Sequence, residues 1–235
     1  MIKRKRLGQH FLHSSAIAKS IVFEAKITKD DVVFELGTGL GILTPFLCQY
    51  AKKVISIDAD GELYEKAKSK FSGIINLFLE FGDGFKNTEN FSIFVSNLPY
   101  SKSKEAIEWL AQTHFSHGVI MVQKEFAEKL LTKSAKDRRA ISVIANHTLE
   151  IEKFLDVKKS NFSPPPNVDS VVLKIIKKKS IDRDLINVLN KIFSYRRKTI
   201  HNIFKQFGKE IIIEKRLDDL TGDEIINLAK EILSN

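Results

Sequence analysis

The sequence predicts an α/β protein: an open, mostly parallel sheet covered by helices on both faces, followed by a small helical domain. Short β-branched runs alternate with helical stretches through the first half of the chain, and parallel strands require such crossover connections. A glycine-rich turn follows the first of these runs. Beyond residue 178 the apolar spacing is helical to the end. We therefore predict two domains, over 1–178 and 179–235.

The first elements are a lead-in helix and a strand, turn and helix unit. Apolar residues at helical spacing predict a helix from Ser14 to about Lys26, with Ser14 or Ser15 as its N-cap. A β-rich run over 32–36 then enters the glycine turn, and 42–51 has a helical pattern. This order is typical of the first unit of a nucleotide-binding sheet.

The alternation continues and then changes near residue 140. Further strands are expected over 54–57, 74–79, 91–97 and 119–122, with helices over 61–71, 103–112 and 124–133. Two longer β-like stretches, 149–157 and 168–176, flank a proline loop, which favours an antiparallel pair closing the sheet. The tail predicts helices near 182–195, 199–207 and 221–233, the last capped by Thr221.

The charge is unevenly distributed. There are 38 Lys and Arg against 29 Asp and Glu, a net charge of +9. Residues 1–6 carry +4 and residues 171–235 carry +5, while 7–170 are neutral. Scattered lysines on a solvated surface explain many basic chains. An excess concentrated at both ends of a neutral body instead favours a polyanionic partner.

Cysteine usage and hydropathy limit the compartment. The single cysteine, Cys48, excludes an internal disulfide framework. No apolar run reaches the roughly 20 residues that span a bilayer, and the N-terminus has no apolar signal-peptide core. His10 with His13, and His114 with His117, lack further ligands in the pattern, so no metal site is expected. The expectation is a cytoplasmic protein with no membrane partner.

The glycine turn is a candidate cofactor site. Gly37, Gly39 and Gly41 let a ligand approach the backbone, and Asp58 closes the second strand, where an acid can accept both ribose hydroxyls. The Gly-x-Gly-x-Gly spacing differs from the dinucleotide fingerprint and favours S-adenosylmethionine over NAD, although the loop alone does not separate them. Asp83 can accept from an adenine amino group, or it is simply a turn aspartate between two glycines.

Asn97-Leu98-Pro99-Tyr100 ends the fourth expected strand, at the sheet edge where ligands bind. An Asn-x-Pro turn is a simpler interpretation. However, the Asn97 side-chain oxygen and the Pro99 carbonyl can accept the two N–H bonds of an exocyclic amino group. They would favour a pyramidal nitrogen whose lone pair points at a sulfonium methyl, while Tyr100 stacks on the base. No metal or strong base is needed, because a thioether leaves neutral.

Taken in order, the motifs resemble one family. They are Gly8 to Leu12, Glu35 to Gly39, Asp58, Asp83, Asn97 to Tyr100, Val122 to Glu125 and Phe162 to Ser170. From Gly8 to about Phe204 the chain is similar to the ribosomal RNA adenine dimethyltransferases. This resemblance implies a Rossmann-like class I fold that uses S-adenosylmethionine, with a small C-terminal helical domain.

The resemblance also implies roles for individual residues. The cofactor would be held by His10, Leu12, Gly37, Gly39, Asp58, Asp83 and Asn97. Phe162 would stack on the target adenine opposite Tyr100, and the alternative is that Phe162 is a core residue beside a proline turn. The RNA contacts would come from the basic residues Lys3, Arg4, Lys5, Arg6, Arg196, Arg197 and Lys198.

The expected function is dimethylation of an adenosine amino group, as the resemblance implies. The expected target is a pair of adjacent adenosines near the 3′ end of small-subunit ribosomal RNA, in ribosome biogenesis. The partner is that RNA or an assembling small subunit, and the enzyme acts as a monomer. Against the family pattern, the segment 135–142 and the tail are short. Two alternatives stay open: a large-subunit methyltransferase of the macrolide-resistance type, and a non-catalytic RNA- or DNA-binding assembly factor.

Overall fold

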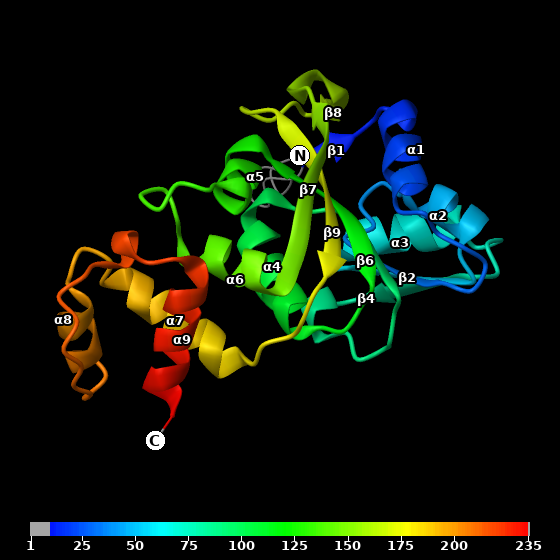
Figure 1. The fold of residues 1–235 in the computed structure, drawn as a ribbon. Helices are drawn as coiled ribbons and strands as arrows, with labels where there is room; N and C mark the ends of the chain where they lie inside the picture. The colour runs from blue at the N-terminus through cyan, green and yellow to red at the C-terminus, as the bar shows by residue number, and fades with distance from the viewer. Residues whose placement is uncertain (1–9, 235) are drawn as a thin grey trace. The chain divides into compact units, whose positions relative to one another are not determined.

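The structure, a computed structural model, describes residues 10–234 and contains a seven-stranded sheet of order β4-β3-β2-β5-β6-β9-β7 (Figure 1). Its strands are β2 (Val32–Leu36), β3 (Lys53–Asp58), β4 (Leu77–Phe81), β5 (Ile93–Asn97), β6 (His117–Gln123), β7 (Leu149–Val157) and β9 (Ser170–Lys177). The pairs from β4 through β6 are parallel, while β9 runs antiparallel to β6 and lies between β6 and β7. The predicted α/β sheet is therefore confirmed.

A separate two-stranded sheet joins distant parts of the chain. Strand β1 (Phe11–Leu12) pairs antiparallel with β8 (Phe162–Ser163), with Phe11 opposite Ser163 and Leu12 opposite Phe162. The His13 amide also donates to the Asn161 carbonyl oxygen at 3.0 Å. The N-terminal segment is thus bound to the proline loop.

The helices lie close to their expected positions. They are α1 (Ser15–Glu24), α2 (Thr44–Tyr50), α3 (Gly61–Lys70), α4 (Ser103–Gln112), α5 (Lys124–Leu131), α6 (Ala140–Thr148), α7 (Arg183–Ser194), α8 (Ile200–Lys205) and α9 (Gly222–Leu233). Local sequence fixes several starts: the Ser14 hydroxyl accepts from the Ile17 amide, and Thr221 and Glu224 form a capping box at α9.

Two expectations need correction. Strand β4 begins at Leu77, not near 74, because the amide of Ile74 donates to the Phe71 carbonyl oxygen in a turn that ends α3. Helix α6 was not predicted, because its β-branched residues are typical of strands. In α6 those side chains are buried, as Val143 and Ile144 show.

The chain divides into two compact units, each assembled from separate stretches of sequence. Unit 1 comprises 1–106, 114–127 and 152–177, and unit 2 comprises 107–113, 128–151 and 178–235. The predicted two-domain boundary at residue 178 stays a prediction. Within residues 10–234, no helix is long and apolar enough to cross a membrane.

Each unit has its own core. In unit 1, α1 packs beside α2, and buried residues such as Ile21 and Leu47 join Val33 and Val95 of the sheet (Figure 1). In unit 2, α7 and α9 lie side by side and both pack against α6, around a cluster that includes Leu189. Burial of these apolar faces, at about 25 cal/mol per Å2, stabilises each unit.

Candidate active site

A pocket of about 240 Å3 opens at the carboxyl ends of β2 and β5, where the strand order of the sheet reverses. Ligands of open α/β sheets bind at this position because the loops after the two strands diverge. All of the residues predicted to hold the cofactor line this pocket: His10, Leu12, Gly37, Gly39, Asp58, Asp83 and Asn97. Pro99 and Tyr100 line it as well. The whole pocket lies within unit 1.

The glycine loop follows β2 directly. Gly37 and Gly39 have φ values of +81° and +58°, which disfavour residues with a Cβ. The Gly37 amide donates to the Ile57 carbonyl oxygen at 2.8 Å, which holds the loop against β3. A Cβ on Gly39 would lie 3.7 Å from the Phe11 ring. Phe11 of strand β1 therefore lies beside the glycine loop, and both line the pocket.

Asp58 connects the end of β3 to this loop. One carboxylate oxygen accepts the Gly39 amide at 2.7 Å, and the other accepts the Asp60 amide at 2.8 Å. Burial raises the pKa of Asp58, and the two amide hydrogen bonds act in the opposite direction. A carboxylate has about four lone-pair sites, so two remain for ribose hydroxyls.

Glu35 is a pocket residue to which the sequence assigned no separate role. Its Oε2 accepts from the Thr44 hydroxyl at 2.8 Å and the Ser56 hydroxyl at 2.6 Å, and Ser56 also bonds Thr38 at 2.6 Å. Burial raises the pKa of Glu35 to about 7. This network links β2, the glycine loop, α2 and β3, so it holds these four segments together beside the pocket.

The far end of the pocket can hold a flat ring. The Asp83 side chain accepts the Phe85 amide at 3.1 Å and lines the pocket together with Leu63, Ala59 and Phe85. An acceptor beside apolar walls matches an adenine, which combines an amino group with two flat faces. The sequence pointed to Asp83 alone, because Leu63 and Phe85 come from separate elements.

Asn97 is the last residue of β5. The Leu98 amide donates to the Met121 carbonyl oxygen at 3.1 Å, which fixes the backbone next to Asn97. Across residues 10–234, no hydrogen bond engages the Asn97 carboxamide. The Pro99 carbonyl accepts the Lys102 amide at 2.8 Å and keeps a second lone pair. Both acceptors are thus available to an amino group.

Tyr100 is the last residue of the Asn97–Tyr100 motif and the first of a short turn over 100–102. Its hydroxyl lies 2.7 Å from the Ser170 hydroxyl, and its ring centroid lies 5.5 Å from that of His10, with the ring planes 33° apart. The His10 Nδ1 atom is 2.8 Å from the Pro164 carbonyl oxygen. Three motifs that are distant in sequence therefore meet at the rim of the pocket.

Phe162 is placed differently from the other predicted site residues. It is 3% exposed, belongs to the buried cluster of unit 1 and is absent from the pocket lining. The burial of Phe162 therefore agrees with the alternative interpretation, in which Phe162 is a core residue beside the proline turn. Stacking on a base would require the ring to turn out of this cluster, and this role stays a prediction.

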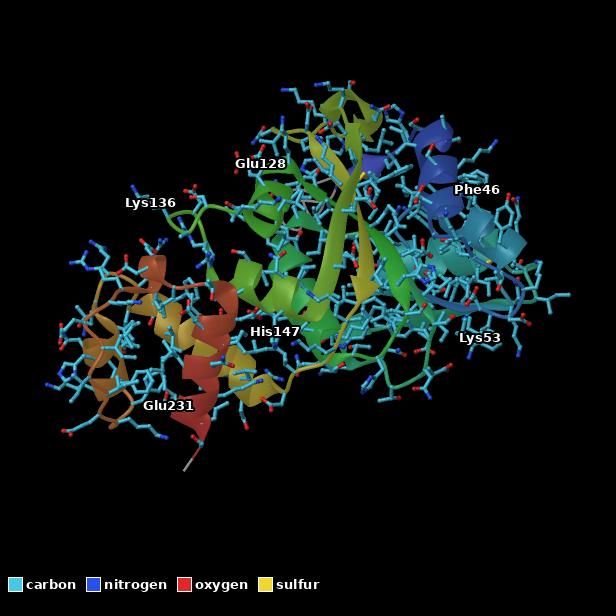
Figure 2. The ribbon with its side chains drawn as sticks, viewed as in Figure 1. Phe46, Lys53, Glu128, Lys136, His147 and Glu231 are labelled. Carbon is cyan, nitrogen blue, oxygen red and sulfur yellow. The ribbon has the colours of Figure 1, made fainter. Side chains whose placement is uncertain are left out.

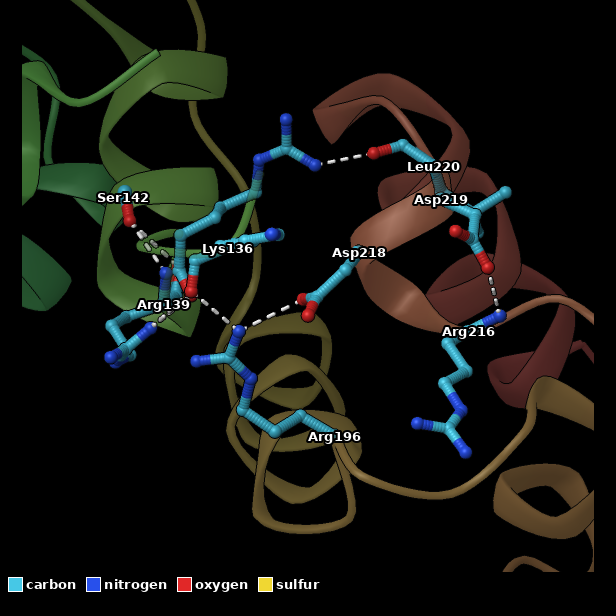
Figure 3. A network of polar contacts seen from close by, with 9 residues as sticks. Lys136, Arg139, Ser142, Arg196, Arg216, Asp218, Asp219 and Leu220 are labelled. Carbon is cyan, nitrogen blue, oxygen red and sulfur yellow. Dashed lines mark hydrogen bonds and ion pairs between the residues drawn. The ribbon is translucent and has the colours of Figure 1, made fainter. Parts of the chain in front are cut away.

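The predicted RNA contacts differ in their surroundings. Arg196 donates to the Asp218 carboxylate at 2.8 Å and to the Lys136 carbonyl oxygen at 2.7 Å, as Figure 3 shows. Arg197 and Lys198 are exposed, as is the Lys136 side chain between α5 and α6 (Figure 2). The bonds of the partly exposed Arg196 side chain to two other segments thus distinguish it from its two neighbours.

A second arginine joins the same segments of unit 2. Arg138 donates to the Leu220 carbonyl oxygen, and the Arg216 amide donates to Asp219 at 2.8 Å (Figure 3). The predicted contacts Lys3, Arg4, Lys5 and Arg6 lie outside the described residues.

The fold and the pocket together define a class I, S-adenosylmethionine-dependent methyltransferase. The residues fit that cofactor: the positive-φ glycines would lie beside its methionine part, the Asp58 carboxylate would hold its ribose, and an apolar region with an acceptor would take its adenine. The family model "Ribosomal RNA adenine dimethylase" matches residues 2–232. The chain belongs to that family.

Individual relatives agree with the assignment. Ribosomal RNA small subunit methyltransferase A of Thermotoga maritima is 35% identical, over 97% of this chain and 85% of that protein. The solved structure of a dimethyladenosine transferase from Plasmodium falciparum matches with a TM-score of 0.80 and 30% identity, covering 95% of this chain and 98% of that one. The 23S rRNA methyltransferase ErmE matches at a TM-score of 0.66 and 19% identity, covering 95% and 100%, which shows the shared fold.

Proposed function

We propose that this protein transfers methyl groups from S-adenosylmethionine to the exocyclic amino nitrogen of adenosine in small-subunit ribosomal RNA, producing dimethyladenosine. Family membership and the 35%-identical relative named for the small subunit support the proposal. The observation that carries it is Asn97. Its carboxamide has no bonding partner within residues 10–234 and lines the same pocket as the glycine loop.

The residues of the chain account for the chemistry. An adenine amino group is a poor nucleophile because its lone pair is delocalised into the ring. The Asn97 oxygen and the Pro99 carbonyl accept its two N–H bonds and so favour a pyramidal nitrogen with a directed lone pair. Tyr100 supplies an aromatic face for the extruded base.

Bond making and breaking balance without a metal or a strong base. When bound, S-adenosylmethionine supplies a methyl group on a positively charged sulfur, whose departure leaves a neutral thioether. The N–C bond forms as the S–C bond breaks, and the nitrogen then releases its proton to water. The chain's task is therefore orientation of the amino group, which suits a pocket lined by carboxamide and carbonyl oxygens.

We further propose that the target is a pair of adjacent adenosines near the 3′ end of the small-subunit RNA. In this proposal the enzyme works as a cytoplasmic monomer on the RNA or on an assembling subunit. The basic terminal regions, including Arg197 and Lys198, hold the RNA. ErmE, named for 23S rRNA, is the reference for the large-subunit alternative, but its 19% identity supports only the fold. The named small-subunit relative at 35% identity favours the small subunit.

Methyl transfer to purified ribosomal particles tests the proposal. The protein is incubated with labelled S-adenosylmethionine and either immature small subunits or large subunits from a strain lacking the enzyme, and the modified nucleotides are mapped by mass spectrometry. We expect dimethyladenosine in small-subunit RNA alone. A mark on large-subunit RNA instead would support the runner-up. Binding of particles without any transfer would support a non-catalytic assembly factor.

A further inference from the structure

The Tyr100 hydroxyl lies 2.7 Å from the hydroxyl of Ser170, a residue that the mechanism does not use. Ser170 is the first residue of β9, is 0% exposed and faces Gln123 of β6 in the strand register. Because the sheet fixes its backbone and burial fixes its side chain, the Ser170 hydroxyl is a rigid anchor. Tyr100, by contrast, lies in a short turn and is only half-buried.

The neighbour of Ser170 in sequence makes its position still more definite. Asp169 accepts the Lys159 amide at 2.9 Å and the Lys158 ammonium at 3.0 Å, so its carboxylate is already engaged. The Lys124 amide donates to the Asp169 carbonyl oxygen at 3.0 Å. Ser170 is therefore held from both β6 and the turn that precedes β8, and its hydroxyl is the group that bonds Tyr100.

A ring that stacks on a base needs an orientation as well as a flat face. Stacking is tolerant of base identity, because every base has a π-face, so stacking alone does not fix where the base lies. His10 contacts the Tyr100 ring with a tilt of 33°, which limits the movement of the ring toward His10. The hydroxyl bond at the far tip is a directional contact that fixes where the end of the ring lies.

We propose that Ser170 is a positioning residue: its hydroxyl orients the Tyr100 ring so that the stacked adenine presents its amino nitrogen to Asn97 and Pro99. The inference rests on the proposed methyl transfer. Loss of the hydroxyl keeps the stacking face but lets the tip of the ring, and the base stacked on it, shift. Small misplacements of reacting atoms cost rate steeply, so the methyl-transfer step is expected to slow about tenfold.

The experiment is a double-mutant cycle in single-turnover methyl transfer, with immature small subunits as substrate. The variants are Ser170→Ala, Tyr100→Phe and the two combined. Each single variant should slow transfer about tenfold, and the double variant should be no slower than the slower single one. The dissociation constant for S-adenosylmethionine, measured by calorimetry, should stay within twofold of the wild-type value in all three.

A matched control removes a comparable hydroxyl at the amino end of the parallel strands, away from the pocket. Ser92 donates to the Asp31 carboxylate at 2.8 Å just before β5, so Ser92→Ala should leave the transfer rate unchanged. A purely structural role for Ser170 would slow transfer by the same factor in the Tyr100→Phe background. Tyr100→Phe breaks the same hydrogen bond without altering the buried strand, so it tests the proposal even if Ser170→Ala does not fold.

The outcomes separate this inference from the proposed function. Wild-type transfer with an unaffected Ser170→Ala variant, or with fully additive losses, overturns the role of Ser170 and leaves the function standing. Absence of transfer by the wild type on every particle overturns both. Wild-type transfer with non-additive losses supports both.

Discussion

Arg196 and Asp218 form an ion pair with an N···O distance of 2.8 Å, and the same guanidinium nitrogen bonds the Lys136 carbonyl oxygen (Figure 3). The contact joins the turn after α7 to two other segments of unit 2. Its side chain is 24% exposed and bonds two other segments, whereas Arg197 and Lys198 beside it are exposed. Adjacent cations in one basic run thus have different surroundings.

Substitutions can test whether these differently placed cations have different functions. Neutralising Arg197 and Lys198 together should weaken RNA binding and reduce the slope of log affinity against log salt by about one per lost phosphate contact. Arg196→Gln should leave that slope nearly unchanged but lower the free energy of unfolding by about 1 kcal/mol, since the ion pair is partly exposed. Filter binding across salt concentrations and urea denaturation measure the two effects. Equal slopes for all variants would contradict the phosphate role.

Substitutions of Asn97 and Asp58 should affect different steps. The Asn97 variant should lose methyl transfer, and the Asp58 variant should lose cofactor affinity. Asn97→Ala removes the acceptor aimed at the base and should abolish transfer, while the dissociation constant for S-adenosylmethionine stays within about threefold. Asp58→Asn loses charge-assisted bonds worth about 1.5–3 kcal/mol and should weaken cofactor binding at least tenfold. Calorimetry and transfer assays on the same preparations decide this. Near wild-type transfer by Asn97→Ala would refute its assigned role.

Glu35 should make stability depend on pH. Burial raises its pKa from 4.5 to about 7, so the folded state holds the proton more tightly than the unfolded state. Its stabilising contribution is complete below pH 4.5 and is lost as the pH rises to about 7. Relative to Glu35→Gln, the wild type should therefore lose up to about 3 kcal/mol of unfolding free energy across that interval. Urea denaturation at several pH values measures the difference.

A second variant checks that the effect comes from this carboxyl group. Thr44→Val removes one of the hydroxyls that donate to Glu35 and lower its pKa. The upper end of the pH interval should then move to higher pH. A wild-type curve parallel to that of Glu35→Gln would show that Glu35 does not titrate in this range.

Phe162→Leu distinguishes a core residue from a base-stacking one. Leucine fills most of the buried space, so the unfolding free energy should fall by less than about 1.5 kcal/mol. The flat face is lost, and stacking is worth about 1–3 kcal/mol per base, so transfer should slow about tenfold. Single-turnover rates and thermal denaturation give the two values. Unchanged transfer would assign Phe162 to the core alone.

Much of the fold follows from local sequence. The alternation of β-branched runs and helices predicts the parallel sheet, and the order of strands places the glycine loop and Asn97 at one edge. Helix α6 does not follow from local sequence, because Ile141, Val143 and Ile144 favour strands. Burial of this segment in the core of unit 2 favours the helix instead. Tertiary packing therefore determines the secondary structure of that segment.

The site likewise contains residues that local sequence indicates and contacts that form only in the fold. Residues with a special backbone or a side chain at a strand end, such as Gly37 and Asp58, are visible in the sequence. The Glu35 network is not, because Thr44 and Ser56 belong to different elements and meet it only in the fold. The pairing of Arg196 likewise depends on Asp218, 22 residues away.

The pairing of β1 with β8 sets the order in which the pocket is completed during synthesis. His10 and Pro164, joined at this sheet, are 154 residues apart. A nascent chain that has emerged only through β6 already carries the glycine loop, Asp58 and Asn97, but Phe11 and Leu12 have no strand to pair with. Strand β1 can pair with β8 beside the cofactor pocket only after the proline loop has left the ribosomal exit tunnel. The cofactor pocket is thus complete only after more than two thirds of the chain has been made.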